Sequence, residues 1–293
     1  MRARDTHSRA SKYARVNERT CRRERRGGRM DQRDLWDVIV DNDDICFKHI
    51  LPKLNRNDIK FLYDVNSETR ALVRRSSRKD ELKEKFEVRD MLSISTLEFV
   101  WEKRSLWPDW FDETKVCERV ALTNKLELLK WVREMKNCDW DAEAISWAAH
   151  QGNLEMVKYC VANECPMNED ACSLASYKGR LECLKYLHEE AKAPWNWETA
   201  AFAAERGHLH ILEYLVERKY DKFDTTACWF AAADGHLDCL KYLHETAKAP
   251  WDSYSVVKAH ENNHPECLQY LLDNDCPLPD GWRYERGTLH SLP

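Results

Sequence analysis

Cysteine and histidine are the residues whose chemistry would be most distinctive in this chain, which has 12 Cys and 11 His among 293 residues. Clusters of these side chains can hold zinc, which needs four converging ligands, or activate a thiol for nucleophilic attack. The spacing supports neither use, because there is no Cys-x-x-Cys and the closest pair is Cys160 and Cys165. Most other cysteines recur at two positions of a repeated pattern, where a thiol serves as a small hydrophobic side chain: Cys117, Cys172 and Cys228, and Cys183, Cys239 and Cys267. No Ser/His/Asp grouping or Gly-rich phosphate loop stands outside that pattern, so we expect no enzyme, cofactor or metal site.

The pattern behind these cysteines is an internal repeat. Residues 181–196 recur as residues 237–252 with three differences in sixteen positions, 56 residues apart. Half that distance is the true period, because three independent columns recur every 27–28 residues. The first column has Gly at 152, 179, 207 and 235, with Asn124 and Asn263 at its two ends. The second has Tyr at 159, 186, 214, 242 and 270. The third column, of large apolar residues, runs from Trp140 to Leu278.

Each unit is predicted to be a pair of short helices. The first helix follows a capping residue, whose side chain accepts free N–H groups at a helix start: Asp141, Asn168, Asn196, Asp224 or Asp252. It ends at the Gly column, where a left-handed residue terminates a helix. A second helix then begins at a Leu, and we expect it to bury that Leu, the residue three later and the Tyr. Helices this short are marginal alone, so stacking of neighbouring units must stabilise them as a solenoid.

The run Ala-Ala-x-x-Gly-His-Leu-x-x-Leu-x-Tyr-Leu, seen at Ala203–Leu215 and in the counterpart ending at Leu243, resembles ankyrin repeats. The resemblance covers residues 91–279 and implies an all-α fold, a solenoid of stacked helix pairs, with the tail 280–293 as a C-terminal cap. The unit is shorter than the usual ~33 residues, which implies stubby connecting loops. The family also implies that His208 and His236 bond to the backbone, and that the protein binds other proteins.

A different pattern in residues 31–75 predicts a small helical N-terminal domain, with residues 76–90 as a charged helical connector. The sequence Ile50-Leu51-Pro-Lys-Leu54, followed by a second helix, is similar to an F-box. F-boxes dock on the small adaptor subunit of cullin-type ubiquitin ligases. The resemblance nominates six residues for that contact: Ile50, Leu51, Leu54, Ile59, Leu62 and Val65. The alternative is a helical cap packed on the first repeat.

Charge is distributed unevenly along the chain. Eleven of the 46 Lys and Arg residues but only three of the 51 acids lie in residues 1–29, which leaves residues 30–293 with a net charge of −13. An acidic body makes nucleic acid an unfavourable partner. The basic segment 1–30 is interpreted as a disordered tail, or as sequence upstream of a start at Met30; a nuclear address or a nucleic-acid arm is the alternative. No apolar run is long enough to cross a membrane, so we expect a monomeric intracellular protein, cytoplasmic or nuclear.

Candidate binding residues are those that break the repeat pattern on its exposed face. Positions one, two, five, nine and ten after the cap should face outward, toward the inner curve of the stack, and most hold polar or small residues such as Glu143, Ser146, Glu169, Ser173 and Ala201. Aromatic and Arg side chains are the usual anchors of protein interfaces. Five stand at or beside these positions and are our candidates for partner binding: Tyr177, Trp197, Arg206, Trp229 and Tyr254.

Two functional hypotheses follow, together with a less favoured third. The protein is either an adaptor that recruits a substrate to a ubiquitin ligase through its N-terminal helices, or a plain ankyrin-type scaffold without a ligase link. The third is an Arg-tailed nucleic-acid-associated factor. The identity of the bound protein is not encoded in any motif, because ankyrin-type surfaces are set by scattered exposed residues.

Overall fold

The structure, a computed structural model, describes residues 46–54, 56–65, 67–84, 91, 93–103, 107, 113–285 and 288–291. The predicted basic tail at 1–30 lies outside these residues, as do residues 31–45 of the predicted N-terminal domain. The chain divides into two compact units, residues 1–79 and 80–293.

The N-terminal unit contains short helices, as its apolar spacing predicts. They are η2 (Cys46–Ile50), η3 (Leu51–Lys53), α4 (Arg56–Val65) and α5 (Ser67–Arg75). Their buried apolar residues come from three of these elements: Leu51, Ile59, Leu72 and Val73. The Arg78 guanidinium donates hydrogen bonds to the carbonyl groups of Leu51 and Leu54, which satisfies the backbone where Pro52 prevents a regular helix. Of the predicted connector 76–90, residues Lys79–Lys83 form the 3-10 helix η4, and residues 85–90 lie outside the described part.

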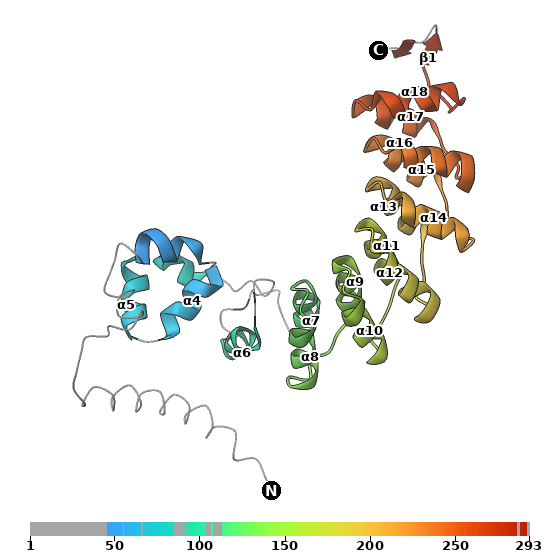
Figure 1. The fold of residues 1–293 in the computed structure, drawn as a ribbon. Coiled ribbons are helices and arrows are strands. Elements are labelled where there is room, and N and C mark those ends of the chain that lie inside the picture. Colours follow the sequence, from blue (N-terminus) through green and yellow to red (C-terminus); the bar gives the residue numbers. More distant parts are fainter. Residues whose placement is uncertain are drawn as a thin grey trace, which may run out of the picture. The chain divides into compact units, whose positions relative to one another are not determined.

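The second unit is a stack of helix pairs (Figure 1). Helix α6 (Ile94–Glu102) comes first. The pairs that follow are α7 (Glu113–Ala121) with α8 (Leu126–Glu134), α9 (Ala142–Gln151) with α10 (Leu154–Ala162), α11 (Asp170–Tyr177) with α12 (Leu181–Lys185) and η7 (Tyr186–Glu190), α13 (Trp197–Glu205) with α14 (Leu209–Glu217), α15 (Thr225–Ala233) with α16 (Leu237–Tyr242) and η8 (Leu243–Ala247), and α17 (Ser253–Glu261) with α18 (Pro265–Asp273). The all-α solenoid predicted from the 28-residue period is confirmed.

The predicted capping residues begin the first helices, with one exception. The side chains of Asp141, Asn196, Asp224 and Asp252 each accept a hydrogen bond from the backbone N–H two residues later. The prediction was wrong for Asn168, because Glu169 is the residue before α11 and has no side-chain capping bond. The Asn168 amide donates to the Asp170 carboxylate at 2.7 Å, and α11 begins one residue later than the pattern predicts.

The Gly column ends first helices in the left-handed conformation, with φ between 64° and 77° at residues 152, 179, 207 and 235. Asn124 and Asn263 adopt the same conformation at the ends of the array, as their place in the column predicts. A second constraint comes from the next repeat. A Cβ on Gly207 would lie 2.7 Å from Nδ1 of His236, so the column also leaves room for a side chain from the following unit.

Close packing of the first helices holds the stack together. The paired small residues of the first helices are fully buried: Ala148, Ala149, Ala175, Ser176, Ala203, Ala204, Ala231 and Ala232. They let α9, α11, α13, α15 and α17 contact one another far more extensively than the second helices do. Because the second helices are further apart, the first helices line the inner curve of the stack.

The second helices differ in one respect from the predicted pattern. The residue three after the opening Leu is fully buried, as at Val157, Leu184, Leu212 and Leu240, but the opening Leu itself is only half-buried. The buried position is instead two residues after it, as at Cys183 and Ile211. Tyrosines of the repeated column bond to a Glu of the preceding unit, as Tyr214 does to Glu189 at 3.1 Å and Tyr270 to Glu245 at 2.9 Å.

The tail that follows the last pair forms a β-hairpin, which the sequence did not predict. Strands β1 (Trp282–Glu285) and β2 (Thr288–Ser291) pair antiparallel. The Trp282 ring packs edge-on against His260 of α17, with centroids 5.2 Å apart, and Gln269 of α18 donates to the Tyr284 hydroxyl at 2.9 Å. The tail therefore contacts both helices of the final pair.

Candidate protein interface

The predicted anchor residues fall into two groups in the structure. Trp197 and Tyr254 are 42% and 45% exposed, and they stand at the starts of α13 and α17. Tyr177 and Trp229 are half-buried, while the Arg206 side chain is 44% exposed at the end of α13. All five lie on first helices or at their ends.

The expectation that the fifth position after the cap faces outward was wrong for three units. Ser146, Ser173 and Ala201 occupy that position and are buried, because it faces the neighbouring first helix. The buried serine hydroxyls donate to carbonyls one helical turn earlier, as Ser146 does to Ala142 at 2.8 Å. A small side chain is therefore required there for packing.

Trp229 stands at the same position but is too large for the space that Ser or Ala fills. Its ring turns partly outward, stacks on Phe230 with centroids 3.8 Å apart, and meets Tyr254 of the next repeat edge-on at 5.4 Å. We define Trp197, Trp229 and Tyr254 as the aromatic patch.

A further row of partly exposed aromatic residues, which the sequence did not lead us to expect, lies six positions after the cap. This row contains Trp147, Phe202 and Phe230. Phe202 meets Tyr177 edge-on, with ring centroids 5.7 Å apart. The Arg206 guanidinium lies over the Tyr177 ring, 4.2 Å from its centroid. The signal that could have revealed this row was the recurrence of large apolar residues every 27–28 positions, with Leu174 between Trp147 and Phe202.

Acidic residues occupy the first turns of three neighbouring first helices. We define Glu143, Glu169, Asp170 and Glu198 as the acidic strip. None of these four forms a salt bridge with a Lys or Arg in the described part of the chain, by the criterion of an N–O distance within 4.0 Å. Burial raises the pKa of Glu143, and the nearby carboxylates of Glu118 and Asp170 raise it further. The carboxylates of successive repeats therefore repel one another.

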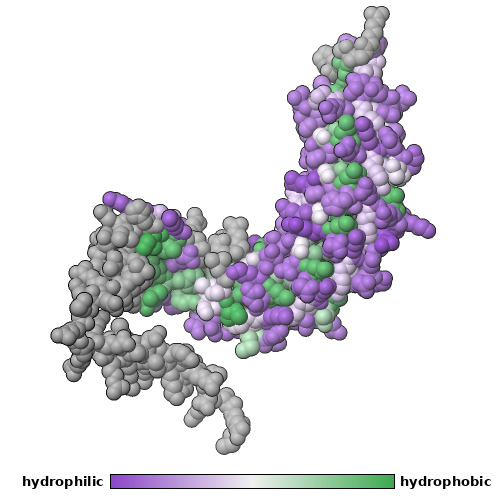
Figure 2. Space-filling model, in the orientation of Figure 1, coloured by the Kyte–Doolittle hydropathy of each residue, from purple (hydrophilic) through white to green (hydrophobic). Residues whose placement is uncertain are grey.

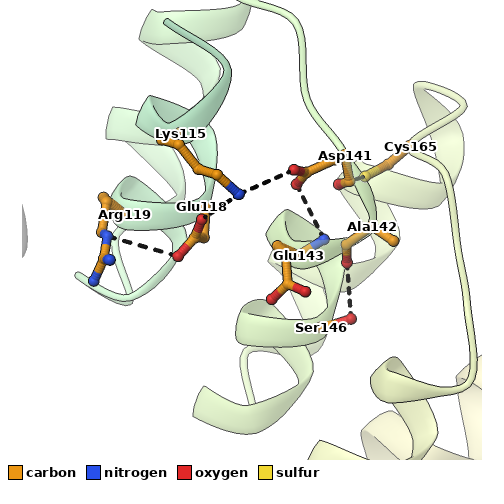
Figure 3. Close-up of polar contacts among 8 residues, drawn as sticks. All are labelled: Lys115, Glu118, Arg119, Asp141, Ala142, Glu143, Ser146 and Cys165. Atoms are coloured by element: carbon orange, nitrogen blue, oxygen red, sulfur yellow. Dashed lines mark hydrogen bonds and ion pairs between the residues drawn. The ribbon is translucent and has the colours of Figure 1, made fainter. Parts of the chain in front are cut away.

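Figure 3 shows how the first repeats neutralise the carboxylates that adjoin this strip. Lys115 of α7 contacts Glu118 at 3.2 Å and Asp141 at 3.5 Å, and Arg119 lies 3.6 Å from Glu118. Asp141 meanwhile caps α9 through the backbone N–H of Glu143. Among the described residues no Lys or Arg forms such a contact with the Glu143 carboxylate, two residues after Asp141, where the acidic strip begins.

The ten cysteines between Cys117 and Cys276 are buried in the repeats. Burial raises the pKa of Cys172 and Cys228 to about 12, so both thiols are neutral and poorly suited to nucleophilic chemistry. Cys165 and Cys276 donate to the carbonyls of Asp141 and Asp252, each 24 residues earlier. Among the described residues, no group of three or more His, Cys, Asp or Glu side chains converges as a metal site would require. His236 bonds through Nε2 to the Glu205 carbonyl at 3.0 Å, the backbone role that the family resemblance implies.

The fold and this surface define a helical-repeat protein with an aromatic and charged inner face. In the space-filling view of Figure 2, apolar residues on the repeats appear as small patches among hydrophilic ones. The family model for ankyrin repeats (3 copies) matches residues 172–253 and again residues 200–280. Residues 172–280 are therefore ankyrin repeats. No curated protein matches the sequence.

The candidate ligase-binding residues of the N-terminal unit are only partly accessible. Leu51 and Ile59 are buried in its core. Val65 is 63% exposed, and three others are half-buried: Ile50, Leu54 and Leu62. The ankyrin match does not include these residues. No helix in the described part of the chain is long and apolar enough to span a membrane.

Proposed function

We propose that this protein is a protein-interaction scaffold that holds its partner against the first helices of the ankyrin stack. The observation that supports this most directly is the exposure of Trp197, which is 42% accessible on a helix start where other repeats have Ala, Glu, Thr or Ser. The repeat pattern therefore does not require a Trp at this position. Exposed aromatic side chains on a polar surface are typical of binding sites.

Burial of this side chain by a partner would contribute appreciably to affinity. A Trp side chain has roughly 250 Å² of surface. Covering the exposed 42% would therefore contribute roughly 2–3 kcal/mol. Because the first helices are rigidly packed through their buried small residues, binding would require little ordering of the scaffold itself.

Affinity capture with matched variants tests this proposal. Full-length protein, Trp197→Ala, Tyr254→Ala and Met135→Ala would be used as baits, with bound proteins identified by quantitative mass spectrometry. Met135 is the control, because it is 70% exposed but lies just after α8, a second helix. We expect the first two variants to lose the same partners, and the control to retain them. Equal recovery by all four baits would show that the first-helix face is not the interface.

The second candidate function is that of a substrate-recruiting adaptor for a cullin-type ubiquitin ligase. Two observations support it. Residues 1–79 form a compact unit of their own, and Val65 is 63% exposed at the end of α4.

Pull-down with the purified adaptor subunit tests this second function. Intact protein, a version lacking residues 30–75, and Val65→Asp would be compared. The adaptor hypothesis predicts that only the intact protein binds. Binding by all three, or by none, would reject a ligase link and leave the scaffold function in place.

A further inference from the structure

The acidic strip and the aromatic patch together indicate the kind of segment that the scaffold binds, an inference that rests on the proposed function. We propose that the partner presents an extended segment with Lys or Arg side chains at one end and a bulky apolar side chain at the other. The basic end would lie over the acidic strip, and the apolar end would cover the aromatic patch.

The aromatic patch provides the apolar end of this surface. Trp197 starts α13, while Trp229 and Tyr254 belong to α15 and α17 and touch each other at 5.4 Å. Between them, the first two residues of α15 are Thr225 and Thr226, both small. A bulky side chain of the partner that packs against Trp197 would lie beside these threonines.

Charge complementarity indicates that the other end of the partner segment is basic. The acidic strip runs along the starts of α9, α11 and α13, in the same row as Trp197. The corresponding positions of α15 and α17 hold Thr225, Thr226, Ser253 and Tyr254, which are all uncharged. The row is therefore acidic toward the N-terminal repeats and aromatic toward the C-terminal ones. Asp224 and Asp252 also stand at the starts of α15 and α17, where each caps its helix. Acids favour helix N-termini, but that preference does not explain why the two positions after the cap are acidic only as far as α13.

The spacing of the repeats sets the spacing within the partner. Packed helices lie about 10 Å apart, so Glu143 on α9 and Trp197 on α13 are separated by roughly 20 Å. An extended chain rises about 3.4 Å per residue. The basic residues should therefore lie about six positions from the apolar residue.

The opposite ends of the first helices carry charges of both signs. Lys178, Arg180 and Arg206 are exposed there, and so are Asp234 and Glu261. Burial lowers the pKa of His208 most, and the nearby His210, His236, Arg180 and Arg206 lower it further. An acidic segment would be attracted to that edge instead. Arg206, however, already lies over Tyr177 and 3.7 Å from Glu205, so this edge is partly neutralised.

Selection from a random 16-residue phage-displayed library on the full-length protein tests the proposal. We expect enriched peptides to carry at least two Lys or Arg about six positions from a Trp, Phe, Leu or Met. Synthetic copies would then be measured by fluorescence anisotropy. Glu143→Gln combined with Asp170→Asn should weaken binding about fivefold at low salt, and by less at 0.5 M salt, since screening removes the attraction. These isosteric changes add no bulk, and circular dichroism would verify that the double variant is folded.

The possible outcomes separate this inference from the proposed function. Enriched peptides that need Trp197 but lack basic residues, or whose affinity is unchanged in the double variant, would overturn the inference and leave the scaffold function intact. Enrichment of acidic peptides would overturn it in favour of the opposite edge. Failure to enrich any peptide that depends on Trp197 would reject the interface, and the inference with it.

Discussion

The imidazole of His236 lies over Gly207 of the preceding repeat, close enough that a Cβ on the glycine would be 2.7 Å from Nδ1. The same imidazole bonds to the carbonyl of Glu205 at 3.0 Å. One side chain thus fills the space that the glycine leaves and satisfies a carbonyl near the end of the preceding helix. The stack is joined by such contacts between neighbouring units, in addition to the buried small residues of the first helices.

Replacement of Gly207 by Ala should therefore destabilise the array twice over. The residue has φ of 69°, and the new methyl group would displace His236. We expect the free energy of unfolding to fall by about 1–3 kcal/mol, measured by urea denaturation. Gly281→Ala is the control, because Gly281 has φ of 79° but is exposed at the start of the hairpin. Equal losses in both variants would show that the contact with His236 contributes nothing.

A second column of left-handed residues offers a stabilising substitution. Lys219 has φ of 57° after α14 and is exposed. Lys219→Gly removes the steric cost of this conformation and should raise the free energy of unfolding by up to about 1 kcal/mol. The matched control is Glu213→Gly, an exposed position within α14, which should lose about 1 kcal/mol. Thermal melting of both variants checks the opposite signs, and a loss in Lys219→Gly would contradict the argument.

The buried thiols should make the protein sensitive to alkaline pH. Burial raises the pKa of Cys172 and Cys228 to about 12, against about 8.5 in an unfolded chain. Between these values only the unfolded state loses the proton, so stability should fall as pH rises above about 8.5, and should not depend on these groups at lower pH. Urea denaturation at pH 7, 9 and 10 measures the slope, and Cys228→Ala should make it shallower. An identical slope in that variant would contradict the assignment.

The same burial predicts that the repeat thiols resist modification in the folded state. At pH 8, iodoacetamide should leave Cys172 and Cys228 unmodified in native protein and label both in urea, as read from peptide mass spectra. A low reactivity follows from exclusion of the reagent as well as from the small thiolate fraction. Rapid labelling of either residue without denaturant would show that its repeat opens readily.

The two tryptophans of the aromatic patch should differ in their effect on stability. Trp229 is half-buried against Phe230 and Tyr254, so Trp229→Ala should cost about 1–3 kcal/mol of folding free energy. Trp197 is 42% exposed and has no ring contact among the described residues, so its replacement by Ala should cost less than Trp229→Ala does. Chemical denaturation of the two variants distinguishes them. A large loss in Trp197→Ala would place that residue in the core and remove it from the candidate interface.

The fold could be predicted because the same local sequence signals recur in every repeat. Cap, small pair, glycine and tyrosine recur at fixed spacing, and errors occurred where one residue was interpreted by its column alone. Asn168 has the residue type of a cap, but its amide bonds to Asp170 instead. The hairpin at residues 282–291 lies outside the repeats, so no recurring sequence position predicted it.

The period, the helix pairs and the residues that break the pattern could all be predicted from the amino-acid sequence, because they depend on local backbone preferences and on burial that repeats every 28 positions. Which of those exceptions reach the surface depends on the packing of neighbouring repeats. Ser173 and Trp229 share a column, yet one is buried between helices and the other turns outward, because exposure depends on side-chain volume against the neighbouring repeat. The acidic strip likewise exists only where stacking places the first turns of α9, α11 and α13 side by side.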